Sequence, residues 1–180
     1  MRGESHRCLG HYLVQRYINH VPGCCVRLFL IGCVQPDRNP VTYLKGSIRH
    51  QWLRGHNFRN SARYMRKLSQ RLEGRQSLRF WDYYALGKLI HYTADAFTFA
   101  HNEYFPKDLE AHRKYEVELQ DQFLNYLRKD PEVNIVLAKS IMQTILRYHE
   151  EYRSLEPHIH TDMTYTLTVC CSVLTFLFAN

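Results

Sequence analysis

Residues 78–98 constrain the fold most strongly, because this stretch is apolar on nearly every face of a helix. A helix that is apolar around its whole circumference has to be surrounded by other structure. Ser77 stands just before the stretch and can cap its first turn. The chain contains no strand-like alternation, internal repeat or low-complexity tract. We therefore predict an all-α fold in which other helices surround a buried central one.

The other helices are predicted from apolar residues at helical spacing and from the Gly and Pro residues that interrupt them. The segment 35–57 is rich in Pro, Gly, Asn and Arg, which predicts a long connection with at most a short helix around residues 43–52. Loops of this length in compact domains are usually functional. The predicted helices are one that contains Leu9, Leu13 and Tyr17 and stops at Pro22–Gly23, one at residues 25–34 that ends at Pro36, and further ones at residues 58–72, 109–127, 131–152 and 161–178.

Length and composition predict one compact domain over residues 1–180, since domains commonly contain about 100–150 residues. Apolar residues make up 45% of the chain and charged residues 23%, which excludes a disordered chain. The net charge of +7 favours anionic partners such as phosphoesters or nucleic acid, without choosing between them. Eleven histidines are more unusual than this charge, because imidazole is a common metal ligand.

The cysteines and the two ends of the chain predict the cellular compartment of the protein. None of the six cysteines forms a C-x-x-C motif, so we interpret them as reduced and mostly buried thiols. The N-terminus has no continuous apolar stretch of the signal-peptide type, which predicts a cytoplasmic protein. Residues 164–179 are uncharged, but Thr and Ser interrupt them and they fall short of the roughly 20 residues that span a bilayer. We expect a buried last helix and no transmembrane segment.

Two pairs of candidate metal ligands are spaced four residues apart. His91 and Asp95 share one face of the central helix, and His112 and Glu116 share one face of a later helix. A buried carboxylate beside an imidazole needs compensation, which a divalent cation supplies. Gly87, one turn before His91, is expected to leave room above the site. The alternative for a single pair is a hydrogen bond in the core or an ordinary surface pair, but two pairs together with His101 favour zinc.

The order His91-x-x-x-Asp95, His101 and His112-x-x-x-Glu116 resembles the central signature of the zinc-dependent phospholipase C family. This family is similar in fold to the single-strand-specific nucleases of fungi, and its members are helical and hold three zinc ions. The resemblance implies that His91 and Asp95 bind one zinc, with Asp95 bridging to another. It also implies that His101, His112 and Glu116 bind the remaining ion.

Earlier positions of the family's ligand set are matched more loosely. The resemblance assigns the family's N-terminal histidine to His6 and its Pro-Asp dipeptide to Pro36 and Asp37. A further histidine is expected between Asp37 and the central helix, and both His50 and His56 compete for it. We favour His56, because it opens the helix that follows.

The sequence departs from the family pattern in two places. Many members have Pro before the histidine that matches His101, whereas this chain has Ala100, which loosens a helix end without removing a ligand. Secreted members use the free amino end as a zinc ligand, but here five residues precede His6. The second departure predicts that a third zinc is weak, exchangeable or absent, so we expect two or three ions.

The function that follows is hydrolysis of a phosphodiester by a metal-activated water, with a phospholipid as one candidate substrate and nucleic acid as a less favoured one. Asp37 would orient that water or act as general base. The alternative is a non-catalytic module with structural zinc, whose Arg-rich segment 59–71 binds acidic lipid or nucleic acid. The absence of a His-Asp dipeptide argues against an HD-type phosphohydrolase, and the absence of Glu-x-x-His argues against a di-iron protein.

Overall fold

The computed structural model describes residues 1–39, 58–102, 104–105 and 108–178, and every regular element in these ranges is helical. The all-α fold class is therefore confirmed, whereas the extent of the domain and the cytoplasmic location stay predictions. The elements are α1 (Gly3–Leu13), the π-helical turn η1 (Val14–Ile18), α2 (Gly23–Arg38), α4 (Phe58–Glu73), α5 (Phe80–Ala96), the 3-10 turn η3 (Phe99–His101), α6 (Leu109–Arg128), α7 (Ile141–Arg153) and α8 (Ile159–Phe178).

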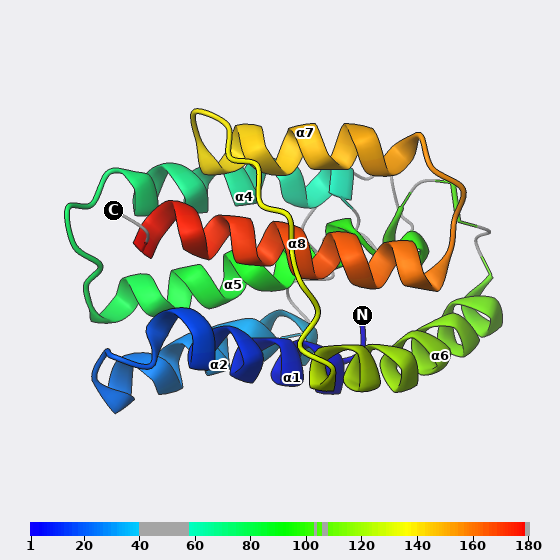
Figure 1. The fold of residues 1–180 in the computed structure, drawn as a ribbon, viewed down its shortest axis with the longest axis horizontal. Helices are drawn as coiled ribbons and strands as arrows, with labels where there is room; N and C mark the ends of the chain where they lie inside the picture. Colours follow the sequence, from blue (N-terminus) through cyan, green and yellow to red (C-terminus); the bar gives the residue numbers. More distant parts are fainter. Residues whose placement is uncertain (40–57, 103, 106–107, 179–180) are drawn as a thin grey trace.

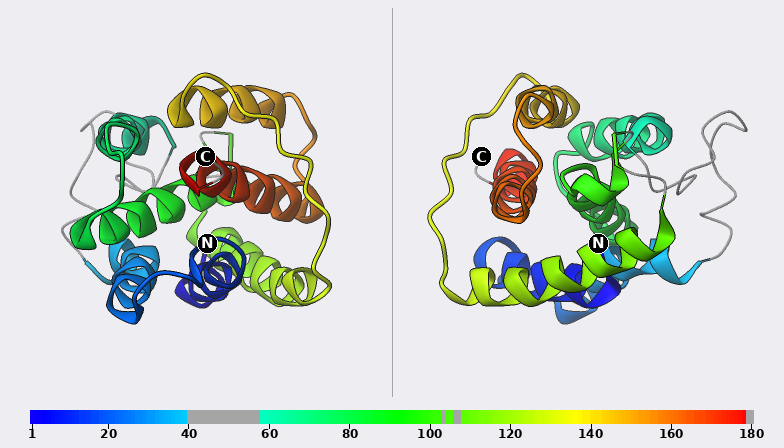
Figure 2. Two further views of the ribbon diagram at one scale, coloured as in Figure 1. Left: turned by 60° about the vertical axis from the view of Figure 1, so that its left-hand side comes forward. Right: turned by 90° about the vertical axis from the view of Figure 1, so that its right-hand side faces the viewer.

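The helices are stacked in three tiers (Figures 1 and 2). Helices α4 and α7 form the upper tier of Figure 1, α5 and α8 the middle one, and α1, α2 and α6 the lower one. Contacts between α5 and α2, α4 and α8 place α5 between the outer tiers. Thirteen of the 17 residues of α5 are buried, as expected for a helix with few polar faces.

Helices α2 and α5 approach so closely that their backbones touch. Gly32 of α2 and Gly87 of α5 face each other at the crossing, where a Cβ on Gly87 would lie 2.9 Å from Gly32 Cα. The expectation that Gly87 leaves room above the site is wrong, because the backbone of α2 fills the space that a side chain at Gly87 would occupy. The crossing instead brings the end of α2 against the polar face of α5.

Helix α2 is longer than predicted, because it continues through Pro36 to Arg38. A proline inside a helix removes one backbone donor, but here only two helical residues follow it, and Asn39 N–H bonds to Gln35 O at 3.1 Å. Asp37 therefore lies in the last turn of a helix and not in a loop. The predicted short helix at residues 43–52 lies outside the described residues.

The helix predicted at residues 131–152 begins only at Ile141. Ser140 caps it, because its side chain accepts a hydrogen bond from Gln143 N–H at 3.2 Å. The preceding residues run extended across the outside of the fold, as the yellow segment of Figure 1 shows. Side chains of α7 fix this segment, since Val136 N–H donates to Tyr148 Oη at 2.9 Å and Ala138 N–H to Thr144 Oγ1 at 3.0 Å.

Helix α8 is the one described helix that is long and apolar enough to cross a membrane by length and composition. It lies in the middle tier between α7 and α5 in Figure 1, and 61% of its apolar window is buried within the fold. Core helices of soluble proteins share these properties. This placement agrees with the expected buried last helix.

The start of α5 is held by Asp82 and not by Ser77. The Asp82 carboxylate accepts the Arg79 N–H at 3.0 Å and pairs with Arg71 Nη2 of α4 at 2.7 Å. Burial alone would raise the pKa of Asp82, but the Arg79 N–H and the Arg71 guanidinium together lower it below its ordinary value. The carboxylate thus joins α4 to the first turn of the central helix.

We expect Asp82→Asn to lower the free energy of unfolding by about 1 kcal/mol at pH 7, the usual size of a lost cap. The pair with Arg71 adds little, because the Arg71 side chain is 46% exposed and screened by solvent. Since the pKa of Asp82 is lowered on folding, its contribution is present above about pH 4 and is lost as pH falls through the folded-state pKa. Denaturant unfolding at pH 7 and pH 3 should show the difference shrinking at low pH, and an equal difference at both values would contradict this role. Exposed Asp121→Asn is the control.

Candidate metal centre

Four side chains from three helices converge beside the α2 and α5 crossing. His6 comes from α1, Asp37 from the last turn of α2, and His91 and Asp95 from successive turns of α5. His91 Nε2 lies 3.3 Å from Asp95 Oδ2 and 3.5 Å from Asp37 Oδ1, and His6 Nε2 lies 3.2 Å from Asp95 Oδ1. One potential ligand atom from each of the four residues lies within 4.8 Å of the others. We call these four residues the first ligand group.

The orientation of His91 is fixed from outside the group. Its Nδ1 lies 2.9 Å from the carbonyl oxygen of Cys33 on α2. A carbonyl can only accept, so Nδ1 carries a proton and Nε2 is the ring nitrogen that faces the group. Backbone carbonyls commonly hold metal-binding histidines in this way. The close approach of α2 to α5 is therefore also what aims His91.

His6 is buried in the state that a metal ligand requires. Its ring stacks on that of His91, with centroids 3.9 Å apart and an interplanar angle of 25°. Burial, and then the neighbouring His91, lower the pKa of His6 to about 4, so the ring is neutral at pH 7. Neither ring nitrogen makes a well-formed hydrogen bond, although Nε2 is near Asp95. A buried imidazole left in this state is costly in a protein core unless something binds its lone pair.

A second ligand group consists of His101, His112 and Glu116, which also place one atom each within 4.8 Å of one another. His101 follows α5 on the turn η3, whereas His112 and Glu116 lie on α6. His101 Nε2 is 3.2 Å from Glu116 Oε1, and His112 Nδ1 is 3.7 Å from Glu116 Oε2. Burial lowers the pKa of His112 to about 4, so this imidazole is neutral too.

Asp95 connects the two groups. Besides His6 and His91, it faces His101, whose Nδ1 is 3.7 Å from Asp95 Oδ2. Burial would raise its pKa, but the imidazoles and the amino group of Met1 together lower the pKa of Asp95 well below its ordinary value. Asp95 Oδ2 therefore faces His91 of the first group and His101 of the second, which is the placement expected of a bridging carboxylate.

The amino group of Met1 lies inside the cluster, between Asp95 of α5 and Glu116 of α6. It is 2.6 Å from Asp95 Oδ1, 2.8 Å from His101 Nε2 and 3.2 Å from Glu116 Oε1. Although burial by itself lowers its pKa, the Asp95 and Glu116 carboxylates raise the pKa of this amine to about 10. The five residues before His6 therefore do not hold the amino group away from the cluster, contrary to the expectation from the sequence.

The turn that carries His101 is held by polar groups in place of the family's proline. Asp162 of α8 accepts the Phe99 N–H at 2.7 Å and the hydroxyls of Tyr115 and Tyr152 at 2.6 Å each. Asn102 donates to the carbonyl oxygens of Ala96 and Thr98, at 3.1 and 2.9 Å. These bonds fix the backbone on both sides of Ala100, so the turn is not loosened as the sequence comparison suggested.

The spacing of the ligand atoms fits zinc. Zinc binds imidazole nitrogen and carboxylate oxygen at about 2.1 Å, and tetrahedral ligands at that distance are about 3.4 Å apart. The separations of His91 Nε2 from Asp95 and Asp37 and of His6 Nε2 from Asp95 lie between 3.2 and 3.5 Å. Imidazole nitrogens beside carboxylate oxygens are also the donor set that zinc prefers.

The structure brings together every described residue that the sequence proposed as a ligand. His50 and His56 lie outside the described residues. The five residues before His6 argued against the free amino end as a ligand, yet the Met1 amino group lies inside the cluster. The supporting residues Asp162 and Asn102 were not anticipated from the sequence. A buried acid opposite two tyrosines is visible only once α8 is packed against the η3 turn.

Comparison with protein families identifies the chain. A model of the zinc-dependent phospholipase C family matches residues 26–164, which is well over half of the 180-residue chain. The chain therefore belongs to the zinc-dependent phospholipase C family, as the resemblance indicated, and this membership implies zinc binding and hydrolase activity. No significant match was found among curated proteins or among solved structures.

Proposed function

We propose that the protein is a zinc-dependent hydrolase of phosphodiesters, with a phospholipid as the favoured substrate and zinc bound by both ligand groups. The observation that supports this most directly is the sharing of Asp95 between two histidine and carboxylate groups. Adjacent metal sites that share a carboxylate suit phosphoester hydrolysis, because both oxygens of a displacement reaction can be stabilised. When bound, zinc would supply a water of lowered pKa and positive charge against the phosphate oxygens.

Asp37 is the residue we propose to orient the attacking water and accept its proton. Its carboxylate faces His91 and His6, at 3.5 and 3.9 Å, so it lies at the edge of the first ligand group. Its side chain is 22% exposed, whereas that of Asp95 is 1% exposed. A base has to pass the proton on to solvent, and Asp37 is the more exposed of the two carboxylates in this group.

The same geometry argues against a purely structural zinc site. Structural zinc sites are closed by buried protein ligands, whereas catalytic ones keep a position open. The half-buried Asp37 gives the first ligand group an open side. The alternative of a binding module rests on the basic residues of α4, and charges on one face of an amphipathic helix are usually only solvated.

We expect Asp37→Asn to lower turnover of a phosphodiester about 100-fold or more, the usual size of a lost general base. The melting temperature should change by only a few degrees, because Asp37 lies at the edge of the group. The measurement is hydrolysis of phosphatidylcholine and of a soluble phosphodiester by zinc-loaded protein, with zinc per chain determined for each variant. Exposed Asp121→Asn is the matched control.

The outcomes separate the two functions. Loss of turnover at nearly unchanged stability supports catalysis at the first ligand group. Zinc-loaded wild-type protein that hydrolyses neither substrate, together with a large fall in melting temperature on chelation, would favour the structural-zinc module.

A further inference from the structure

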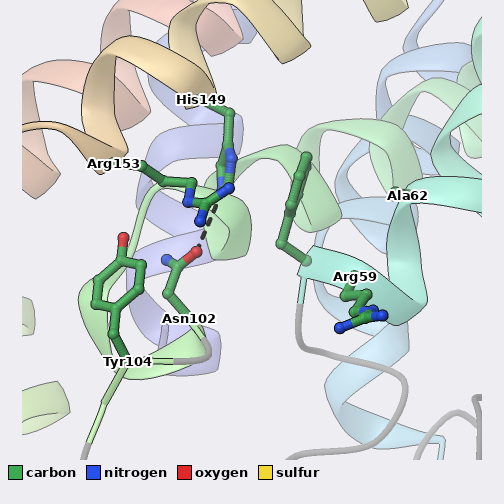
Figure 3. A pocket seen from close by; sticks show the side chains of 7 residues that line it. Arg59, Ala62, Asn102, Tyr104, His149 and Arg153 are labelled. Carbon is green, nitrogen blue, oxygen red and sulfur yellow. Dashed lines mark hydrogen bonds between the residues drawn. The ribbon is translucent and has the colours of Figure 1, made fainter. Parts of the chain in front are cut away.

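A cavity of about 350 Å³ lies on the side of the η3 turn where α4 begins and α7 ends (Figure 3). It is separate from the two ligand groups, and none of its lining residues belongs to them. The residues that line it are Phe58, Arg59, Ala62, Asn102, Tyr104, His149 and Arg153.

The floor of the cavity is rigid and neutral. His149 Nε2 lies 3.1 Å from Asn102 Oδ1, and the Asn102 amide group donates to the carbonyl oxygens of Ala96 and Thr98, just before the η3 turn. An amide oxygen can only accept a hydrogen bond, so His149 donates from Nε2. The His149 ring stacks on Phe58 with centroids 3.6 Å apart, and burial followed by the charge of Arg153 lowers its pKa to about 4. A bound group would meet a fixed surface here.

The rim of the cavity is cationic. Arg59 and Arg153 line it from α4 and α7, and none of the described lining residues is an acid. Figure 3 shows the Arg153 guanidinium beside His149 and Asn102, with Tyr104 on the same side. Among the described residues, Arg153 makes neither a hydrogen bond nor an ion pair, and the Tyr104 side chain is 43% exposed. The end of α7 favours a cation at Arg153, but it does not explain why the Tyr104 phenol lines the same cavity.

We propose that this cavity binds a phosphomonoester or phosphate dianion, held mainly by the Arg153 guanidinium, with Arg59 and the Tyr104 hydroxyl completing the contacts. Guanidinium groups bind phosphate through paired, charge-assisted hydrogen bonds. A cavity lined by the Arg153 guanidinium and a phenol, with no acid among its described lining residues, favours such an anion over a neutral or cationic headgroup. The dianion could come from an anionic lipid headgroup or from free phosphate, which the test distinguishes.

Anion binding in the cavity is independent of the proposed catalysis, but a residue of the cavity is adjacent in sequence to a residue of the second ligand group. Asn102, on the floor, directly follows the ligand His101, and its side chain holds the η3 turn. An anion on this floor would contact the turn that positions the second ligand group. Binding in the cavity does not require zinc or turnover, so the two proposals can fail separately.

The first test is a calorimetric titration of zinc-loaded protein with inorganic phosphate. We expect Arg153→Gln to weaken one binding event about 10-fold or more, as for a lost hydrogen bond to a charged group. Arg153→Lys should lose less, because it keeps the charge but not the paired donors. The matched control is Arg147→Gln on the same helix, since Arg147 is exposed and already paired with Glu151 at 3.3 Å.

A second arm identifies the source of the anion. Binding to phosphatidylcholine vesicles is compared with binding to the same vesicles containing phosphatidic acid, whose headgroup is a phosphomonoester. A preference for phosphatidic acid that Arg153→Gln abolishes and Arg147→Gln retains supports a lipid headgroup. Equal vesicle binding by all variants, together with the weakened phosphate titration, supports free phosphate. If Arg153→Gln and Arg147→Gln behave alike in both arms while melting as the wild type does, the cavity is not an anion site.

Discussion

Gly87→Ala is expected to disrupt the fold at its centre. A Cβ at this position would collide with the carbonyl oxygen of Phe29 and lie 2.9 Å from Cys33 N. Both atoms belong to the backbone of α2 and cannot rotate away, so the two helices have to separate. Overpacking a core usually costs about 1–3 kcal/mol, and contacts with backbone place this change at about 3 kcal/mol or more.

Thermal unfolding measures this effect. For a chain of this size, each kcal/mol lowers the melting temperature by about 2–4 °C, so a fall of about 6–12 °C or failure to fold is expected. Separation of α2 from α5 would also withdraw the Cys33 carbonyl from His91, so zinc per chain should fall in any protein that does fold. Gly23→Ala is the control, because no atom lies within 4 Å of a Cβ there. A wild-type melting temperature for Gly87→Ala would show that the helices do not cross as described.

The helices could be predicted where their evidence lies within one segment. The apolar circumference of residues 78–98 identified the buried α5, since burial on all sides leaves that pattern. Pro36 misled the prediction of the end of α2, because a proline is tolerated when few helical residues follow it. The extended residues before Ile141 were mistaken for helix because of their apolar side chains. Val133 and Ile135 pack partly against the core and the backbone bonds to side chains of α7, which are tertiary interactions that periodicity does not reveal. Gly87 was assigned to the site because its partner Gly32 lies far away in the sequence.

The ligands could be predicted for a similar reason. The pairs His91 and Asp95, and His112 and Glu116, are spaced by one helical turn, so their shared faces follow from helix geometry alone. His6 and Asp37 depended on the family resemblance, because their approach to α5 is set by the packing of three helices. The resemblance pointed to a free amino end among the ligands, but the five residues before His6 argued against it, and only the packing of α1 against α6 shows the Met1 amino group inside the cluster.

Asp95→Asn is expected to abolish measurable phosphodiester turnover and to reduce zinc in both ligand groups. Asp95 Oδ1 faces His6, while its Oδ2 faces both His91 and His101. An asparagine keeps the shape of the side chain but loses its negative charge. Its amide nitrogen carries two hydrogens and cannot bind a metal. Loss of a residue that merely supports a ligand already costs about 10–100-fold in metal affinity or activity, so loss of a shared ligand should cost more.

Glu116→Gln is the comparison for Asp95→Asn, because Glu116 belongs to one ligand group and Asp95 is proposed to serve both. Glu116 contacts His101 and His112 but not the histidines of the first group, so this variant should lose zinc from the second group and keep it in the first. Zinc per chain after dialysis against a graded series of chelator concentrations measures both effects. We expect Asp95→Asn to retain less zinc than Glu116→Gln at every chelator concentration, because its substitution weakens two sites and not one. Equal zinc retention in the two variants would mean that Asp95 serves only one group, and the shared-carboxylate mechanism would then have to be abandoned.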